Sequence, residues 1–284
     1  MKEEEKEMSF LDHLEELRWH VVRALMAIVA CMITAFIFSR YIFDNIIFAP
    51  SKTDFLTFRL LCKLGYAIGS GDALCIQEIP MSIQSRLMTG QFTMALTSSF
   101  IIGIVISFPY VAWEMWRFIR PGLHANEKKY SKGAVASISF LFFLGIAFGY
   151  FVMSPVSVYF LANYQISDVI QNEFDITSYV STVTTLVFGS GILFQLPVVV
   201  YFLSQVGIIT PPILKQYRKH AMVTILVIAA IITPPDPVSQ TIVAVPLFLL
   251  YEFSIFISGV VARRKAREEA EEEAKDRAAK ETTE

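Results

Sequence analysis

FTMALTSSFIIGIVISFPYVAW, residues Phe92–Trp113, contains no Asp, Glu, Lys or Arg. A helix needs ~20 mostly apolar residues to cross the hydrocarbon core of a bilayer, and this stretch is long enough. Similar apolar runs recur along a chain that is 54% hydrophobic, and most charged residues lie between the runs or near the two ends. Soluble domains seldom combine such composition with such segregation of charge. The sequence therefore predicts a membrane protein that crosses the bilayer several times.

The apolar runs predict an all-α fold with six transmembrane helices. They are expected near Trp19–Phe38, Phe92–Trp113, Ala134–Val152, Tyr179–Leu203, His220–Ile232 and Gln240–Val261. The fifth run is too short for a full span and stops at Thr233-Pro234-Pro235. Helices five and six are accordingly expected to be short and to form a tight hairpin.

The distribution of Lys and Arg predicts the orientation, because basic residues accumulate in cytoplasmic loops. The loops at 154–178 and 233–239 carry no Lys or Arg, whereas the alternate loops and the C-terminal segment carry many. Both termini are therefore expected to be cytoplasmic. The predicted organisation is an amphipathic cytoplasmic N-terminal helix over residues 1–18, a six-helix membrane domain over 19–261 and a charged cytoplasmic tail over 262–284.

The three cysteines are not spaced as a metal site. Cys31 lies within an apolar run. Cys62 and Cys75 share one polar connection, where an oxidising compartment would allow a disulfide across a small loop. The sequence leaves two alternatives open for this pair, a disulfide or two unpaired thiols.

Acidic residues at the predicted cytoplasmic edge are candidates for binding a cationic ligand: Glu15, Glu16, Glu114 and Glu127. If the two regions that carry them fold together, they form an acidic surface that suits guanidinium groups, since Arg binds a carboxylate with two hydrogen bonds. The alternative is that these acids only neutralise nearby basic residues of the chain: Arg18, Arg117, Lys128 and Lys129.

Other polar features do not indicate an enzyme. The chain has no Walker loop and no HExxH motif, and no Ser/His or Asp pair lies within the predicted spans. No catalytic residue, metal site, cofactor or nucleic-acid partner is predicted. Gln195 lies in the middle of the fourth predicted span, where a polar side chain faces other protein, either a partner helix or a neighbouring helix of the same chain.

Four stretches together resemble the TatC family, the polytopic subunit of the twin-arginine protein translocase. They are HLEELR at His13–Arg18, FPYVAWEMWRFIRPGLHANEKKY at Phe108–Tyr130, FGSGILFQLPVVVYFL at Phe188–Leu203 and TPPDPVSQ at Thr233–Gln240. They occur in the family's order and cover nearly the whole chain. The first loop, Phe48 to Pro80, is longer than is usual in the family.

The resemblance implies a receptor for signal peptides that carry consecutive arginines, and the core subunit of a proton-motive-force-driven exporter of folded proteins. It implies single-span TatA/TatB-type partners, a homo-oligomeric receptor complex and a bacterial cytoplasmic (inner) membrane. The residues expected at the signal-peptide site are Glu16 and Glu127, with Arg18, Phe118 and Glu15 beside them. Gln195, Met222 and Phe248 are expected to contact partner helices. The alternative functions are a secondary transporter for a cationic solute, which would use the same carboxylates, and a structural scaffold.

Overall fold

The computed structural model describes residues 10–119, 133–167, 169–170, 172–233 and 237–281. Within them, five helical stretches are long and apolar enough to cross a membrane: Glu15–Ile37, Gly90–Ile119, Ala134–Asn163, Ile176–Val206 and Gln240–Arg267. These stretches confirm the all-α, multi-pass architecture. The remaining predicted helix is α11 (Arg218–Ile232), which at 15 residues is about 22 Å long and shorter than the hydrocarbon core.

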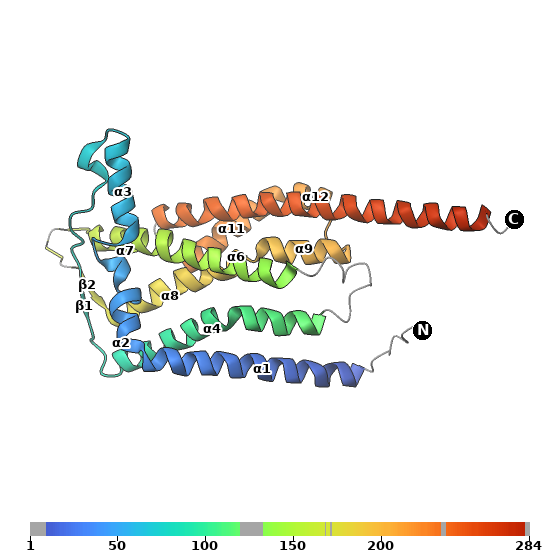
Figure 1. Ribbon diagram of the computed structural model, residues 1–284. Helices are drawn as coiled ribbons and strands as arrows, with labels where there is room; N and C mark the ends of the chain where they lie inside the picture. The colour runs from blue at the N-terminus through green and yellow to red at the C-terminus, as the bar shows by residue number, and fades with distance from the viewer. Residues whose placement is uncertain (1–9, 120–132, 168, 171, 234–236, 282–284) are drawn as a thin grey trace. The chain divides into compact units, whose positions relative to one another are not determined.

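The chain forms two compact units, Met1–Phe188 and Gly189–Glu284. In the first unit, α1 (Phe10–Ile37) and α4 (Gly90–Ile119) run side by side along most of their lengths (Figure 1). α1 continues without a break from the predicted amphipathic N-terminal helix into the first span. α1 ends one residue before its predicted limit, Phe38, whereas α4 extends beyond its predicted limits by two residues at its start and six at its end.

The third span of the first unit is helical throughout but changes its winding. It consists of α6 (Ala134–Phe148), a π-helical segment η6 (Gly149–Met153) and α7 (Ser154–Asn163), with Pro155 in the first turn of α7. Proline is tolerated there because the first amides of a helix have no intrahelical partner. The span is therefore longer than the predicted Ala134–Val152.

A cap of short elements closes the first unit at the end remote from the N-terminus. It contains α2 (Ser39–Ile42), η1 (Phe43–Ile47) and η2 (Ala49–Ser51), and a two-stranded parallel sheet that pairs β1 (Ser82–Gln84) with β2 (Glu173–Asp175). Asp175 then leads into α8 (Ile176–Leu193). Hydrogen bonds from the Thr177 hydroxyl and from the backbone amides of Arg86 and Thr177 lower the pKa of the Asp175 carboxyl. The sequence did not predict this small sheet.

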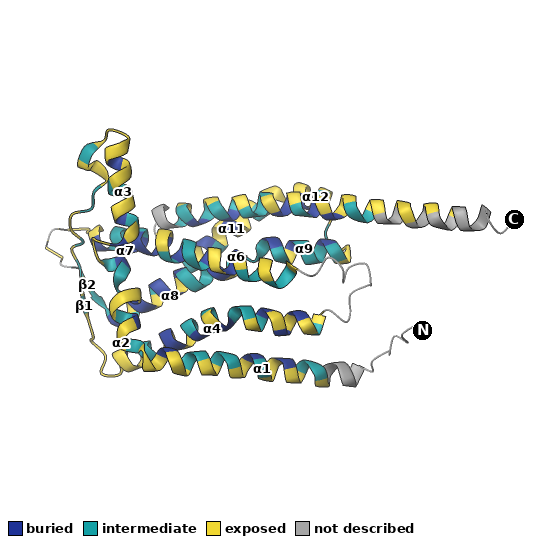
Figure 2. Cartoon of the chain, in the orientation of Figure 1, coloured by how far each residue is buried: buried dark blue, intermediate teal, exposed yellow. Residues whose placement is uncertain are grey.

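Burial follows the pattern of a protein in lipid. The core of the first unit gathers buried residues of the spans and the cap, such as Ile47, Val180 and Val183. Large apolar side chains elsewhere on the spans are exposed, including Ile33 at 56% and Phe140 at 66% (Figure 2). In a membrane, lipid acyl chains rather than protein cover apolar side chains that are exposed on a span.

The long first loop contains a helical hairpin. α3 (Leu56–Ala67) is followed by a turn at Gly69 and Gly71, which both have positive φ, and by the short helix η3 (Gly71–Leu74). Glycine suits the turn because other residues rarely adopt positive φ. A disulfide joins Cys62 to Cys75 across this hairpin, and Cys31 is a free thiol.

Thiol labelling should detect this disulfide directly. In denaturant without reductant we expect one labelled cysteine, Cys31, and with reductant all three. Cys62→Ser should lower the free energy of unfolding by about 3 kcal/mol, because the bridge closes a short loop in the unfolded chain. Three labelled thiols without reductant, in protein taken from its native membrane, would contradict the bridge.

In the second unit, the helix that begins as α8 breaks at Gln195 and continues as α9 (Leu196–Val206), with Pro197 in its first turn. The helices α10 (Pro211–Gln216), α11 and α12 (Pro237–Glu281) follow. The Ser204 and Ser258 hydroxyls, 2.8 Å apart, join α9 to α12. α12 runs further than predicted, so only α11 of the predicted hairpin is short. The Ala, Glu, Lys and Arg residues of the tail favour this extension because all are strong helix formers.

Candidate functional site

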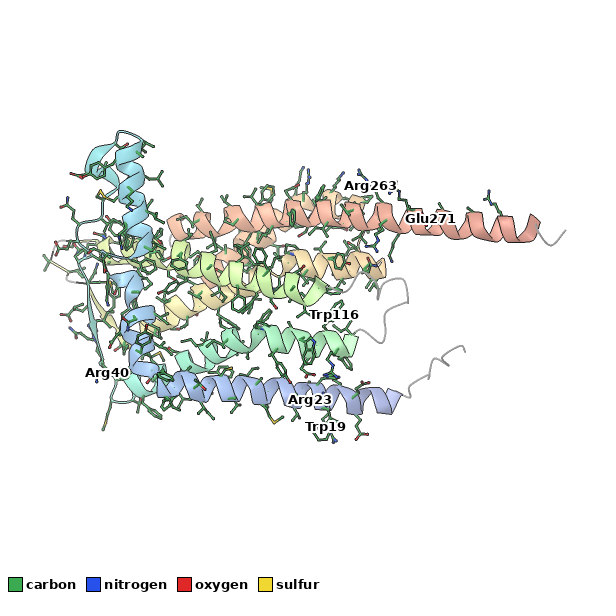
Figure 3. The ribbon with its side chains drawn as sticks, in the orientation of Figure 1. Trp19, Arg23, Arg40, Trp116, Arg263 and Glu271 are labelled. Carbon is green, nitrogen blue, oxygen red and sulfur yellow. A yellow bond between two sulfur atoms is a disulfide. The ribbon has the colours of Figure 1, made fainter. Side chains whose placement is uncertain are left out.

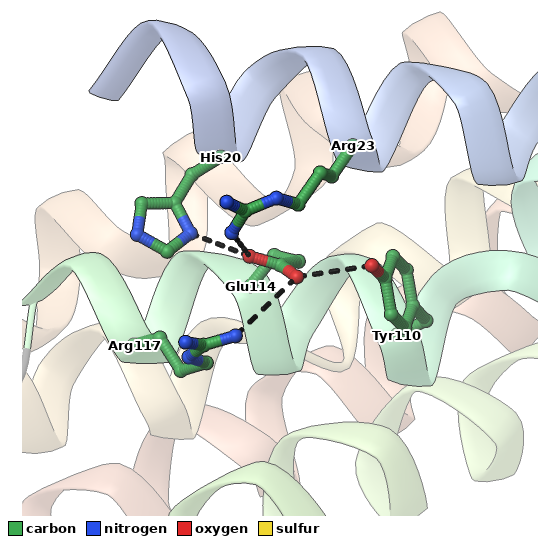
Figure 4. A network of polar contacts seen from close by, with 5 residues as sticks. All are labelled: His20, Arg23, Tyr110, Glu114 and Arg117. Atoms are coloured by element: carbon green, nitrogen blue, oxygen red, sulfur yellow. Dashed lines mark hydrogen bonds and ion pairs between the residues drawn. The ribbon is translucent and has the colours of Figure 1, made fainter. Parts of the chain in front are cut away.

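A buried carboxylate joins α1 to α4 near the N-terminal end of α1 (Figure 4). The Glu114 side chain is only 1% exposed, and its Oε2 lies 2.5 Å from Nδ1 of His20, which is 6% exposed. Its Oε1 accepts a hydrogen bond of 3.0 Å from the Tyr110 hydroxyl. Arg23 and Arg117 approach the two oxygens at 3.7 and 3.8 Å. Glu114 therefore makes polar contacts with both helices.

Helical periodicity brings these side chains together. Tyr110, Glu114 and Phe118 are spaced four residues apart on α4, so they lie along one side of that helix. On α1, His20 follows Glu16 by four residues, so the two side chains lie on one side. The rings of His20 and Phe118 are 6.2 Å apart. The His20–Glu114 contact thus sets which turn of α1 faces which turn of α4.

The electrostatics of this cluster explain why the carboxylate is tolerated in a helix interface. A buried charge is costly unless it is paired and hydrogen-bonded. Glu114 has the buried His20 as a partner and accepts a hydrogen bond from Tyr110, which is 39% exposed, while the Arg23 and Arg117 side chains are 42% and 48% exposed. Arg117 also lies over the Trp113 ring, 4.8 Å from its centre. The two arginines thereby share one carboxylate and still reach the aqueous edge.

The structure describes the predicted signal-peptide residues on α1 and α4. Glu16 is half-buried one turn before His20, and it forms no ion pair or hydrogen bond with another residue of the described ranges. Glu15 instead pairs with Arg18 at 3.5 Å, and both side chains are exposed. Phe118 lies in the last turn of α4. Glu127 lies outside the described residues, in the segment that continues from this end of α4.

Aromatic residues surround the same end of the first unit (Figure 3). Trp19 is 52% exposed on the side of α1 turned away from α4, and the Arg18 guanidinium lies 5.6 Å from its ring centre. Trp116 is buried on α4. Amphipathic aromatic rings of this kind occupy the boundary between membrane and water. The cluster around Glu114 therefore lies near that boundary.

Two of the four candidate acids form ion pairs within the chain. Glu15 and Glu114 pair with basic residues of the chain itself, whereas Glu16 does not pair with any described residue. The sequence prediction also missed His20. One signal was available: a histidine and an acid inside apolar helices each need a partner.

The residues predicted to contact partner helices lie in the second unit. Met222 on α11 and Phe248 on α12 line one apolar groove between these helices, with a volume of about 250 Å³. Gln195 lies at the break between α8 and α9, where its backbone carbonyl accepts hydrogen bonds from the amides of Val198 and Val199. Met222 and Phe248 therefore share one surface, and Gln195 marks a bend in the preceding span.

A further ion pair stabilises the second unit. Glu252 on α12 accepts a hydrogen bond of 2.6 Å from Arg218, the first residue of α11. The side chains are 32% and 47% exposed. A carboxylate within a span needs a partner, and Arg218 is the partner of Glu252.

Comparisons with known proteins agree with these features. The family described as Sec-independent protein translocase protein (TatC) matches residues 12–246. The Sec-independent protein translocase protein TatC of Blattabacterium sp. subsp. Periplaneta americana (strain BPLAN) is 41% identical over 266 residues, covering 93% of this chain and 100% of the relative. That of Helicobacter pylori (strain J99 / ATCC 700824) is 47% identical over 167 residues, covering 59% of this chain and 67% of the relative.

Solved structures are similar over most of their length. A crystal structure of the twin arginine translocase receptor TatC has a TM-score of 0.66 and 29% identity, covering 88% of this chain and 99% of the other. A second crystal structure of that receptor, in DDM, has a TM-score of 0.69 and 30% identity, covering 87% and 99%.

Proposed function

The chain belongs to the TatC family of Sec-independent protein translocases, and we propose on this premise that it is the signal-peptide receptor and core subunit of a twin-arginine translocase. The family is one of non-enzymatic membrane proteins, so the work of this chain is recognition and assembly. The names carried by the relatives and the solved structures favour a translocase over a transporter for a cationic solute.

Glu16 and Glu127 are the proposed partners of the two consecutive arginines of a signal peptide. The observation that carries this assignment is the position of Glu16, half-buried and without an ion-pair partner among the described residues. The pairing of Glu114 with His20 turns the same side of α1 toward α4, and the segment with Glu127 continues from the adjacent end of α4. A partly desolvated carboxylate in that position favours a guanidinium ligand.

The proposed setting is the bacterial cytoplasmic (inner) membrane, with both termini cytoplasmic and the proton-motive force as the source of energy. The distribution of Lys and Arg supports this orientation. Single-span TatA/TatB-type subunits are the proposed partners of the groove between α11 and α12, and a homo-oligomeric receptor complex is proposed with them. Cysteines at Met222 and Phe248 should then crosslink to a single-span subunit, and consistently absent adducts would argue against this surface.

Binding of a synthetic twin-arginine peptide to the purified full chain tests the site. Glu16→Gln and Glu127→Gln should each weaken binding by roughly 10- to 100-fold, because each removes hydrogen bonds to a charged group worth about 1.5–3 kcal/mol. Isothermal titration in detergent micelles measures the change, and export of a folded reporter in cells measures its consequence.

The matched control is Glu173→Gln, which removes an exposed acid paired with Arg86 in the cap of the same unit. It should bind the peptide as the parent chain does. A peptide with two glutamines in place of its arginines should bind all variants equally weakly. Parent-like binding by the Glu127→Gln variant would remove that residue from the site.

A further inference from the structure

α3 carries an apolar stripe that the described chain leaves uncovered. Leu56, Leu60 and Leu64 are four residues apart and therefore lie on one side of the helix. Their exposed fractions are 49%, 51% and 54%. Phe58 and Gly65 lie on the opposite side and are buried, Phe58 to 2%. The exposed side of α3 therefore carries the three leucines, whereas the buried side carries Phe58 and Gly65.

The buried side of α3 is occupied by the protein itself. The Phe58 ring packs against Tyr159 of α7, with ring centres 6.2 Å apart. A Cβ on Gly65 would lie 3.1 Å from Leu74 Cβ, so η3 packs closely on that side. In Figure 1, the returning segment with η3 lies on the side of α3 that is turned away from the spans of the first unit. The leucine stripe therefore lies opposite the side of α3 that contacts Tyr159 and Leu74.

The depth of α3 follows from its anchor. The Thr57 hydroxyl donates a hydrogen bond to the backbone carbonyl of Phe151. Phe151 lies 17 residues after Ala134, the first residue of its span, which corresponds to about 26 Å along a helix. The span Ala134–Asn163 has 30 residues and is about 45 Å long, which exceeds the ~30 Å hydrocarbon core, and Phe151 lies in the half of this span that is remote from Ala134. α3 begins beside Phe151 and runs across the direction of the spans (Figure 1).

The lipid-facing surface of the span continues into the stripe. Phe151 and Val152 are 38% and 37% exposed on a helix that crosses the membrane, and α3 starts beside them. Arg59 and Lys63 are exposed and each precedes a leucine of the stripe by one residue, so they form a basic row along its edge. The sequence of α3 contains no acidic residue. An apolar face bordered by basic residues is typical of helices that bind at an anionic lipid surface.

We propose that α3 is an interfacial helix of the bilayer. Leu56, Leu60 and Leu64 insert at the boundary between headgroups and acyl chains, and Arg59 and Lys63 bind the phosphates of anionic phospholipids. The Cys62–Cys75 disulfide holds the returning segment on the opposite side, which keeps the stripe turned toward the lipid. This role is independent of signal-peptide binding at the other end of the unit.

Photocrosslinking to lipid tests the proposal. A diazirine-bearing residue in place of Leu60, in the full chain reconstituted into phosphatidylglycerol vesicles, should give several-fold more lipid adducts than the same residue in place of Ala73. Ala73 is the matched control because it is exposed on η3, across the hairpin from the stripe. Mass spectrometry of the illuminated protein counts the adducts. Equal lipid adducts at the two positions would overturn the proposal.

The charge requirement has a separate test. In vesicles of equal phosphatidylglycerol and phosphatidylcholine, adducts at position 60 should be enriched in phosphatidylglycerol, and the Arg59→Gln/Lys63→Gln double variant should lose that enrichment. If the adducts of the parent chain are not enriched in phosphatidylglycerol, the proposed preference for anionic lipid is wrong. In native membranes, a discrete protein adduct at position 60 in place of lipid would show that a partner protein covers the stripe and would refute the lipid assignment.

Discussion

Glu114→Ala is expected to lower the free energy of unfolding by about 3–5 kcal/mol, the range for removing one partner of a buried ion pair. The variant leaves the His20 side chain, which is 6% exposed, without its partner 2.5 Å away, and the Tyr110 hydroxyl loses its acceptor as well. Loss of the carboxylate costs less free energy at Arg23 and Arg117, because both side chains are partly exposed. Unfolding by SDS in mixed micelles measures the loss.

A double variant measures how far the contributions of His20 and Glu114 to stability depend on each other. Glu114→Leu with His20→Leu removes both polar groups and should be much less destabilising than the sum of the single changes, since no buried group is then left unpaired. Glu173→Ala is the surface control, because its ion pair with Arg86 is exposed and worth at most about 1 kcal/mol. If the double variant loses as much free energy of unfolding as the two single variants together, His20 and Glu114 do not depend on each other.

The His20–Glu114 pair also shows where sequence reasoning stopped. The predicted second span ended at Trp113 because the next residue, Glu114, is charged. The structure continues the helix through Ile119, and the charge is accommodated by a histidine 94 residues earlier in the chain. Hydropathy averaged over a short stretch of sequence cannot reveal such a partner, because the contact exists only after α1 and α4 pack together.

The spans themselves were predictable for a physical reason. In lipid every backbone polar group must be satisfied within the segment, so an apolar run long enough to span is helical. The polar Gln195 was recognised within the fourth span, and the structure breaks the helix there, with Pro197 in the first turn of α9. The direction of α3 and its pairing with η3 were not predictable, since they depend on contacts with the third span. Glu127 remains a prediction, because it lies outside the described residues.

Gly103 should be the position at which the smallest change separates α1 from α4. A Cβ placed there would lie 2.8 Å from the backbone nitrogen of Met32, 3.0 Å from its Cα and 3.0 Å from the carbonyl oxygen of Ile28. All three atoms belong to backbone, so no side chain can rotate away. Small residues at helix interfaces in membranes allow this kind of approach, and dispersion contacts along the interface depend on it.

Gly103→Ala should therefore cost about 1–3 kcal/mol by overpacking, although alanine favours a helix more than glycine does. Gly103→Leu should cost more and should also draw His20 away from Glu114, since both contacts join the same two helices. The matched control is Gly259→Ala in α12, where an added Cβ meets no heavy atom within 4 Å. That change should stabilise the helix by up to about 1 kcal/mol. Equal SDS unfolding midpoints for Gly103→Leu and the parent chain would mean that α1 and α4 are not held at this distance.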